Sequence, residues 1–291
     1  MRFFLVTAVI FLIGFSVGGA QTIDAGRGEV QLRVPANQNA ADGMALIVLL
    51  HGYSHTGALR ESGWKFGELV DEYQFVLAYP DGTRESGGDR NQFWNASDAC
   101  CNFMGSTVDD SAYLLKLIQR IRTSYEIDPK RIFLVGHSNG GFMSYRFAYD
   151  HSDTVAAIVS VAGAATAMEQ PSPPHAVHVL QIHGTADSVI NYQGGEIRAG
   201  GRDARPYPGA IESAERWATY NGCELNRNSA PELDLDKSVR GNETTVIQYT
   251  TGCNKGGSSE VWTINGGAHT PDISRTFSRR IVEWLLAWPK N

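Results

Sequence analysis

The pentapeptide Gly136-His137-Ser138-Asn139-Gly140 has the pattern Gly-x-Ser-x-Gly, which can present a serine hydroxyl as a nucleophile. The bare pattern also recurs by chance, so its context decides its meaning. Residues 131–135 read RIFLV and predict a buried strand before it, and residues 140–149 predict a helix after it. In such a tight strand–turn–helix, glycines leave room for a serine held in an exposed, strained position. We therefore predict that Ser138 is a nucleophile; the alternative is a glycine-rich turn with a structural serine.

A serine hydroxyl becomes an effective nucleophile when a histidine takes its proton and a carboxylate orients that histidine. Of the five histidines after Ser138, His269 lies in a glycine-rich segment after the last predicted strand, where a loop can bring it to Ser138. His183 precedes a glycine at a strand end and is expected to shape that turn, and Asp187 follows the same strand. We assign His269 as base and Asp187 as acid, with His183 as the next candidate for the base.

Negative charge that develops on a carbonyl oxygen needs backbone N–H donors directed at it. The residue after the nucleophile, Asn139, is expected to supply one donor. The loop after the apolar run 45–50 reads His51-Gly52-Tyr53-Ser54 and is expected to supply the other. Tyr53 is the preferred second donor, and Ser54 is the alternative. A plain strand exit is the simpler interpretation of this loop.

The chain has four cysteines. Cys223 and Cys253 bracket a polar segment and are predicted to form a disulfide, which would stabilise the fold by roughly 3–4 kcal/mol for a loop of about 30 residues. Cys100 and Cys101 are adjacent, so they either form a vicinal disulfide or remain thiols. A zinc site is the alternative for these cysteines, but no Cys-x-x-Cys pair occurs, and neither a metal nor a cofactor is expected.

Apolar runs typical of strands alternate with helical patterns along the chain, which predicts the α/β class with a mostly parallel central sheet and helices on both faces. Two long segments, 83–106 and 188–208, leave the carboxyl ends of predicted strands and should meet at the rim where sites form. The expected strands are residues 45–50, 75–79, 131–135, 156–161, 177–182 and 260–264. The expected helices are residues 59–73, 107–125, 140–149, 210–220 and 275–288.

The first 20 residues have the features of a signal peptide, with Arg2 before an apolar run and small residues at positions 18–20. A membrane anchor or a buried first strand is the alternative. Removal of the leader would leave residues 21–291 as one catalytic domain, exported to an extracellular or periplasmic compartment and no longer bound to a membrane. The net charge is -6 and no basic stripe occurs, which argues against a nucleic-acid partner.

Several motifs together resemble a known group of enzymes. They are HGYSHTG at 51–57, YPDG at 79–82, FWNASDACC at 93–101, GHSNGG at 136–141, HGTAD at 183–187 and GGAHT at 266–270. In this combination and order the sequence resembles the secreted feruloyl esterase, acetylxylan esterase and polyhydroxybutyrate depolymerase group of α/β-hydrolases. The likeness spans nearly all of residues 21–291.

The resemblance implies a serine esterase with Ser138, Asp187 and His269 as its triad, in agreement with the assignment from the residues. It further implies that Trp94 lines an acyl pocket, with loop packing as the alternative, and we also assign His137 as a substrate-binding candidate. Depolymerases of solid polyester typically carry a linker and a binding domain, which are not recognised here, so feruloyl or acetyl esters of plant polysaccharides are the favoured substrates. The alternatives are hydroxyalkanoate oligomers or polymers, a peptidase of the same fold and a non-catalytic binding protein.

Overall fold

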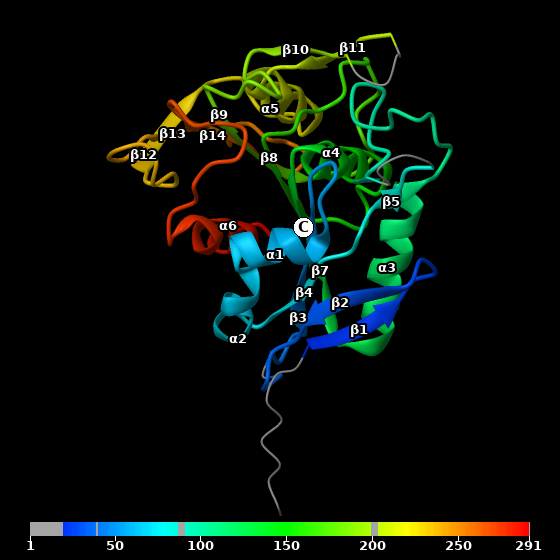
Figure 1. The fold of residues 1–291 in the computed structure, drawn as a ribbon. Coiled ribbons are helices and arrows are strands. Elements are labelled where there is room, and N and C mark those ends of the chain that lie inside the picture. Colours follow the sequence, from blue (N-terminus) through cyan, green and yellow to red (C-terminus); the bar gives the residue numbers. More distant parts are fainter. Residues whose placement is uncertain (1–19, 39, 87–90, 199–202, 291) are drawn as a thin grey trace, which may run out of the picture.

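The computed structural model of the chain describes residues 20–38, 40–86, 91–198 and 203–290. Its centre is a ten-stranded sheet with the order β1-β2-β4-β3-β7-β8-β9-β14-β13-β12 (Figure 1). The six neighbouring strands in the middle are parallel, so the predicted mostly parallel sheet is confirmed. These strands are β4 (Phe75–Ala78), β3 (Met44–Leu50), β7 (Ile127–His137), β8 (Ala157–Val161), β9 (His178–Gly184) and β14 (Ser259–Ile264).

Antiparallel strands extend both edges of the sheet, and the sequence analysis did not predict them. One edge is formed by β1 (Ala20–Asp24) and β2 (Glu29–Arg33), the other by β13 (Thr244–Tyr249) and β12 (Asn228–Leu233). The predicted signal peptide lies outside the described residues except for its last residue, Ala20, which begins β1. Within the described residues, no helix is long and apolar enough to cross a membrane.

Helices cover both faces of the sheet, as predicted (Figure 1). Alternate residues of a strand point to opposite faces, so helices on both faces bury the central strands on both sides; in β7 this holds for residues 132–137. In β3, Leu46 and Val48 pack in the core on one face, and Ala45 and Ile47 pack in the core on the other. The first face is covered by α3 (Asp110–Ser124), α4 (Asn139–Asp150) and α5 (Ala210–Tyr220). The second is covered by α1 (Gly57–Trp64), α2 (Val70–Tyr73) and α6 (Phe277–Ala287).

The prediction of one continuous helix over residues 59–73 was wrong. Helix α1 ends at Trp64, and Lys65 adopts the left-handed conformation with φ 58°. The N–H of Lys65 donates to the carbonyl of Glu61 at 2.6 Å, which closes the helix end. A 3-10 turn over Phe66–Leu69 then redirects the chain into α2 and buries Phe66. Burial of this aromatic ring, which helical periodicity does not register, accounts for the break.

The two long loops meet at one rim, as expected from the strand order. The first carries the hairpin of β5 (Thr83–Arg84) and β6 (Gln92–Phe93), and the second that of β10 (Gly194–Ile197) and β11 (Arg205–Pro208). Asn95 and Phe103 from the first loop and Ile197 and Arg205 from the second line a common cavity of about 470 Å³. Cys100, which also lines it, forms a vicinal disulfide with Cys101 across a cis peptide bond.

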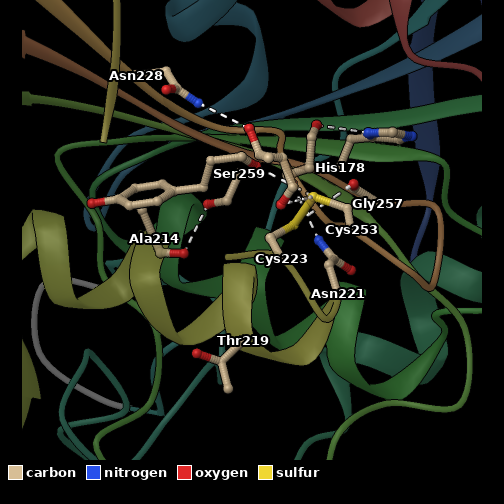
Figure 2. The surroundings of a disulfide bond; sticks show 12 residues. His178, Ala214, Thr219, Asn221, Cys223, Asn228, Cys253, Gly257 and Ser259 are labelled. Atoms are coloured by element: carbon tan, nitrogen blue, oxygen red, sulfur yellow. Dashed lines mark hydrogen bonds between the residues drawn. A yellow bond between two sulfur atoms is a disulfide. The ribbon is translucent and has the colours of Figure 1, made fainter. Parts of the chain in front are cut away.

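The second disulfide joins Cys223 to Cys253, the pairing that the sequence predicted. Figure 2 shows it just after the end of α5, with Asn221 beside it. The side-chain amide of Asn221 donates to the carbonyl oxygens of Val177 at 2.8 Å and of Ser258 at 3.1 Å. The disulfide and this amide therefore secure the junction between α5 and the starts of β9 and β14.

Candidate active site

Ser138 occupies a sharp turn between β7 and α4. Its backbone angles, φ 53° and ψ -119°, lie in a region that residues other than glycine seldom adopt. A side chain at Gly136 would collide with the carbonyl of Gly140, and one at Gly140 would collide with the carbonyl of Leu50. The two glycines therefore allow the close packing that holds Ser138 in this strained position, which is the geometry expected from the motif.

The structure brings the three residues of the predicted triad together. Oγ of Ser138 lies 3.0 Å from Nε2 of His269, and Nδ1 of His269 lies 2.8 Å from Oδ2 of Asp187. The three side chains come from segments that follow β7, β9 and β14, at the carboxyl ends of parallel strands. These contacts form a continuous hydrogen-bonded line from hydroxyl to imidazole to carboxylate.

The carboxylate of Asp187 is fully surrounded by hydrogen-bond donors. Its Oδ1 accepts from the backbone N–H groups of Val189 at 2.8 Å and Ile190 at 2.9 Å, and its Oδ2 accepts from His269 and His183. Burial alone would raise the pKa of Asp187, but the hydrogen bonds from the two histidines and from Val189 hold this pKa well below its usual value. An ionised carboxylate only accepts, so Nδ1 of His269 carries the proton and Nε2 is left to accept from Ser138.

His183 contacts Asp187, whereas His269 is the histidine that contacts Ser138. Its side chain is buried, with Nε2 at 3.1 Å from Oδ2 of Asp187 and at 2.8 Å from the carbonyl oxygen of Ile190. Its Nδ1 accepts from the side-chain amide of Gln181 at 3.1 Å. No sequence motif predicted the contact between His183 and Asp187. Polar residues at alternate positions 181 and 183 of an otherwise apolar strand were the available signal.

The loop after β3 lies against Ser138. A Cβ atom at Gly52 would come within 3.3 Å of Cβ of Ser138. The backbone N–H of Ser54 donates to the carbonyl of Gln92 at 2.8 Å, so Tyr53 remains the candidate donor from this loop. Asn139 is the first residue of α4, and its N–H has no acceptor within the helix. Tyr53 and Asn139 thus remain the candidates for the oxyanion hole.

Trp94 packs against the start of this loop and is hydrogen-bonded to it. It is completely buried, and its Nε1–H donates to the carbonyl of His51 at 3.0 Å. The backbone of Trp94 is in turn held by the side-chain amide of Asn139 through two hydrogen bonds of 2.7 and 2.9 Å. The indole is closed to solvent. Its contacts therefore support the alternative of loop packing and not the predicted position in the wall of an acyl pocket.

The side chain of His137 is also directed inward. It is 2% exposed, with Nδ1 at 3.0 Å from the guanidinium of Arg60 and Nε2 at 3.0 Å from the carbonyl oxygen of His269. Both ring nitrogens are therefore engaged within the protein. In place of the predicted substrate contact, His137 contacts Arg60 and the loop that carries His269.

The parallel sheet, the elbow at Ser138 and the residues at the carboxyl ends of the strands define an α/β-hydrolase. In the described part of the chain, no three His, Cys, Asp or Glu side chains are grouped to hold a metal ion. A model of the phospholipase/carboxylesterase family matches residues 32–199. The chain belongs to this family.

Named relatives of the chain are esterases and a depolymerase. Feruloyl esterase B of Piromyces equi is 26% identical over 250 residues, which cover 83% of this chain and 42% of that protein. Poly(3-hydroxyalkanoate) depolymerase C of Paucimonas lemoignei is 29% identical over 119 residues, which cover 40% of this chain and 27% of that protein. The chain therefore spans less than half the length of each of these two relatives.

Among solved structures, the acetyl xylan esterase from Aspergillus awamori has a similar fold. The superposition gives a TM-score of 0.63 at 16% sequence identity and covers 92% of this chain and 99% of the other. At this identity the likeness concerns the fold alone.

Proposed function

We propose that the chain is a secreted serine carboxylesterase that releases feruloyl or acetyl groups from plant polysaccharide esters through an acyl-enzyme on Ser138. The observation that carries this proposal is the 3.0 Å contact between Oγ of Ser138 and Nε2 of His269, with Asp187 bonded to the opposite nitrogen. The names of the relatives, feruloyl esterase and acetyl xylan esterase, support this class of substrate.

In the proposed acylation step, Oγ of Ser138 attacks the carbonyl carbon of the ester while its proton passes to Nε2 of His269. The carbonyl oxygen becomes an oxyanion, which the backbone N–H groups of Tyr53 and Asn139 stabilise. The imidazolium is stabilised by the ionised carboxylate of Asp187. The C–O bond to the alcohol then breaks, and the alcohol leaves with the proton from His269.

Deacylation repeats these steps with water as the nucleophile. His269 takes a proton from the water, the resulting hydroxide attacks the acyl carbon, and a second oxyanion forms at the same donors. The bond to Oγ of Ser138 breaks, and the serine recovers its proton from His269. The products are the free carboxylic acid and the alcohol, and no cofactor is consumed.

A panel of three esters tests the substrate class. We expect kcat/KM for methyl ferulate or acetylated xylan to exceed kcat/KM for hydroxybutyrate oligomers. The same panel with Ser138→Ala measures any activity from a contaminating enzyme. If hydroxybutyrate oligomers are the best substrates, the polysaccharide ester assignment is overturned while the esterase assignment stands.

The second candidate is a hydrolase of polyhydroxyalkanoates or their oligomers. The 29% identity to the poly(3-hydroxyalkanoate) depolymerase of Paucimonas lemoignei favours it. The same triad chemistry would apply, because this polyester is also a carboxylic ester.

The proposed secretion is supported by the predicted signal peptide at residues 1–20 and by the two disulfides, since disulfides persist in oxidising compartments. N-terminal sequencing of the exported protein should find Gln21 as the first residue. Protein that stays with the cells and begins at Met1 would contradict cleavage.

A further inference from the structure

His137 connects a buried arginine to the backbone of the proposed base. Nδ1 of His137 is 3.0 Å from Nη2 of Arg60 on α1, and Nε2 is 3.0 Å from the carbonyl oxygen of His269. Both side chains are nearly closed to solvent, with Arg60 7% and His137 2% exposed. Neither residue has a place in the transfer of protons described above.

The partners of His137 determine where its ring proton lies. A guanidinium has no acceptor, so Arg60 must donate to Nδ1 of His137. A carbonyl oxygen can only accept a hydrogen bond, so Nε2 of His137 must carry the proton and donate it to the carbonyl oxygen of His269. The ring is therefore neutral and in the Nε2–H form, and its burial and the nearby charge of Arg60 agree by lowering the pKa of His137 well below its usual value.

The hydrogen bond from His137 secures the last residue of a glycine-rich segment. The segment follows β14 and is tied to the loop of the acid, where the N–H of Ala186 donates to the carbonyl of Gly267 at 2.9 Å. Nε2 of His137 also donates a hydrogen bond to the carbonyl of His269. The next residue along the chain, Ser138, bonds through Oγ to the ring of His269. Adjacent residues of the elbow thus fix the backbone and the imidazole of one histidine.

Arg60 is a buried cation with an unusual set of partners. Within the described residues it forms no ion pair with a carboxylate, and its guanidinium lies 4.8 Å from the ring centre of Trp64. Burial lowers the pKa of Arg60 to about 10, so it stays charged at neutral pH. A buried charge without a counter-ion destabilises the fold. A contribution to stability therefore does not account for an arginine at this position.

We propose that His137 and Arg60 are positioning residues of the esterase: Arg60 holds the ring of His137, and His137 holds the backbone of His269 so that its Nε2 faces Ser138. This inference rests on the proposed function of His269 as the base. A displaced base would slow proton transfer from Ser138 and leave ester binding largely intact, because neither side chain is open to the substrate.

The first test compares two substitutions of His137. His137→Phe keeps a ring of similar size but removes the donor, and we expect kcat to fall about 10- to 100-fold with KM changed less than about threefold. His137→Gln can again donate an N–H to the carbonyl of His269 and should restore kcat to within about fivefold of the wild type. Equal loss in both variants, or wild-type kcat in His137→Phe, overturns the proposal.

His178→Phe is the matched control for the loss of a buried histidine. His178 lies at the opposite end of β9 from Asp187, where it bonds to Ser258 at 2.7 Å and stacks on Trp288. Its replacement should lower the melting temperature and leave kcat unchanged. If His178→Phe lowers kcat as much as His137→Phe does, the loss of kcat reflects general destabilisation and the proposal fails.

Two further experiments test the proposal even if His137→Phe does not fold. They are the substitution of Arg60 and an NMR measurement on the wild type. Arg60→Met should lower kcat about 3- to 10-fold at unchanged KM, and Arg60→Lys, which retains a donor, should recover part of it. In the wild type, ¹⁵N NMR of the histidine rings should find Nε2 of His137 protonated and Nδ1 unprotonated. A ring protonated at Nδ1 would overturn the arrangement.

The NMR measurement separates failure of this inference from failure of the proposed function. It reports the hydrogen bonds of His137 whether or not an ester is hydrolysed. A wild type with the expected ring signals but without esterase activity would contradict the proposed function. An active wild type whose kcat does not depend on His137 would contradict only the positioning role.

Discussion

Nε2 of His183 lies 3.1 Å from Oδ2 of Asp187, so a second imidazole besides that of His269 holds the proposed catalytic carboxylate. The His183 ring is fixed in turn by the amide of Gln181, which accepts from the hydroxyl of Tyr145 at 2.9 Å. This chain of hydrogen bonds runs from α4 through β9 to the acid. The orientation of Asp187 therefore depends on side chains that are themselves buried.

Replacement of His183 by Phe should impair the chemical step. Asp187 would lose one of its donors, so its carboxylate would orient His269 less firmly, and we expect kcat to fall about 10- to 100-fold. KM should stay within about threefold of the wild type, because His183 is buried away from the ester. Steady-state kinetics with a soluble ester measures both quantities, and an unchanged kcat would contradict a role for His183 in holding the acid.

Substitution of the nucleophile gives the most direct test of the triad. Ser138→Ala should abolish ester hydrolysis down to a small residual rate, because the hydroxyl that forms the acyl-enzyme is gone. Ser160→Ala is the matched control, since this buried hydroxyl on β8 has no hydrogen-bond partner among the described residues. Wild-type kcat in Ser138→Ala, or equal loss in both variants, would rule out Ser138 as the nucleophile.

The central sheet was predictable because its strands are buried on both faces and read as continuous apolar runs. Helix α5 was predicted at both ends, Ala210 and Tyr220, from its apolar periodicity and the loop before it. The edge strand β12 could not be found in this way. Its residues 228–233 are exposed or half-buried and include Pro231, so they carry no apolar signal.

Local motifs predicted the three residues of the proposed triad, and the structure places their side chains in contact. Ser138, Asp187 and His269 follow β7, β9 and β14, and their order along the chain is the one expected for the triad of this fold. The contact of Arg60 with His137 joins residues 77 positions apart, and neither lies in a motif that predicts the other. The inward direction of Trp94 depends likewise on packing against His51, which sequence spacing does not encode.

Loss of the disulfide between Cys223 and Cys253 should destabilise the fold without altering the site. In the chain-entropy model, Cys223→Ala/Cys253→Ala should lower the free energy of unfolding by roughly 3–4 kcal/mol. Urea unfolding of oxidised wild type and variant measures the difference. The bridge lies near the starts of β9 and β14, whereas Asp187 and His269 follow the ends of these strands, so kcat should be unchanged at a temperature where both proteins are folded.

The carboxyl group of Glu61 should make the stability of the fold depend on pH. Burial raises its pKa from 4.5 to about 7, although the N–H of Gly67 donates to it at 2.7 Å. Between these two values Glu61 of the unfolded chain has lost a proton that the folded chain retains, so the contribution of Glu61 to the free energy of unfolding falls as pH rises and then levels above about pH 7.

Glu61→Gln keeps an acceptor for Gly67 and cannot ionise. Relative to the wild type, its free energy of unfolding should increase by up to about 3 kcal/mol between pH 4.5 and pH 8.5, because only the wild type must bury a charge at the higher pH. Glu68→Gln, which replaces an exposed glutamate on the next turn, should show a much smaller change. Urea unfolding of the three proteins at both pH values measures these differences. A Glu61→Gln variant whose stability follows that of the wild type at both pH values would contradict a raised pKa at Glu61.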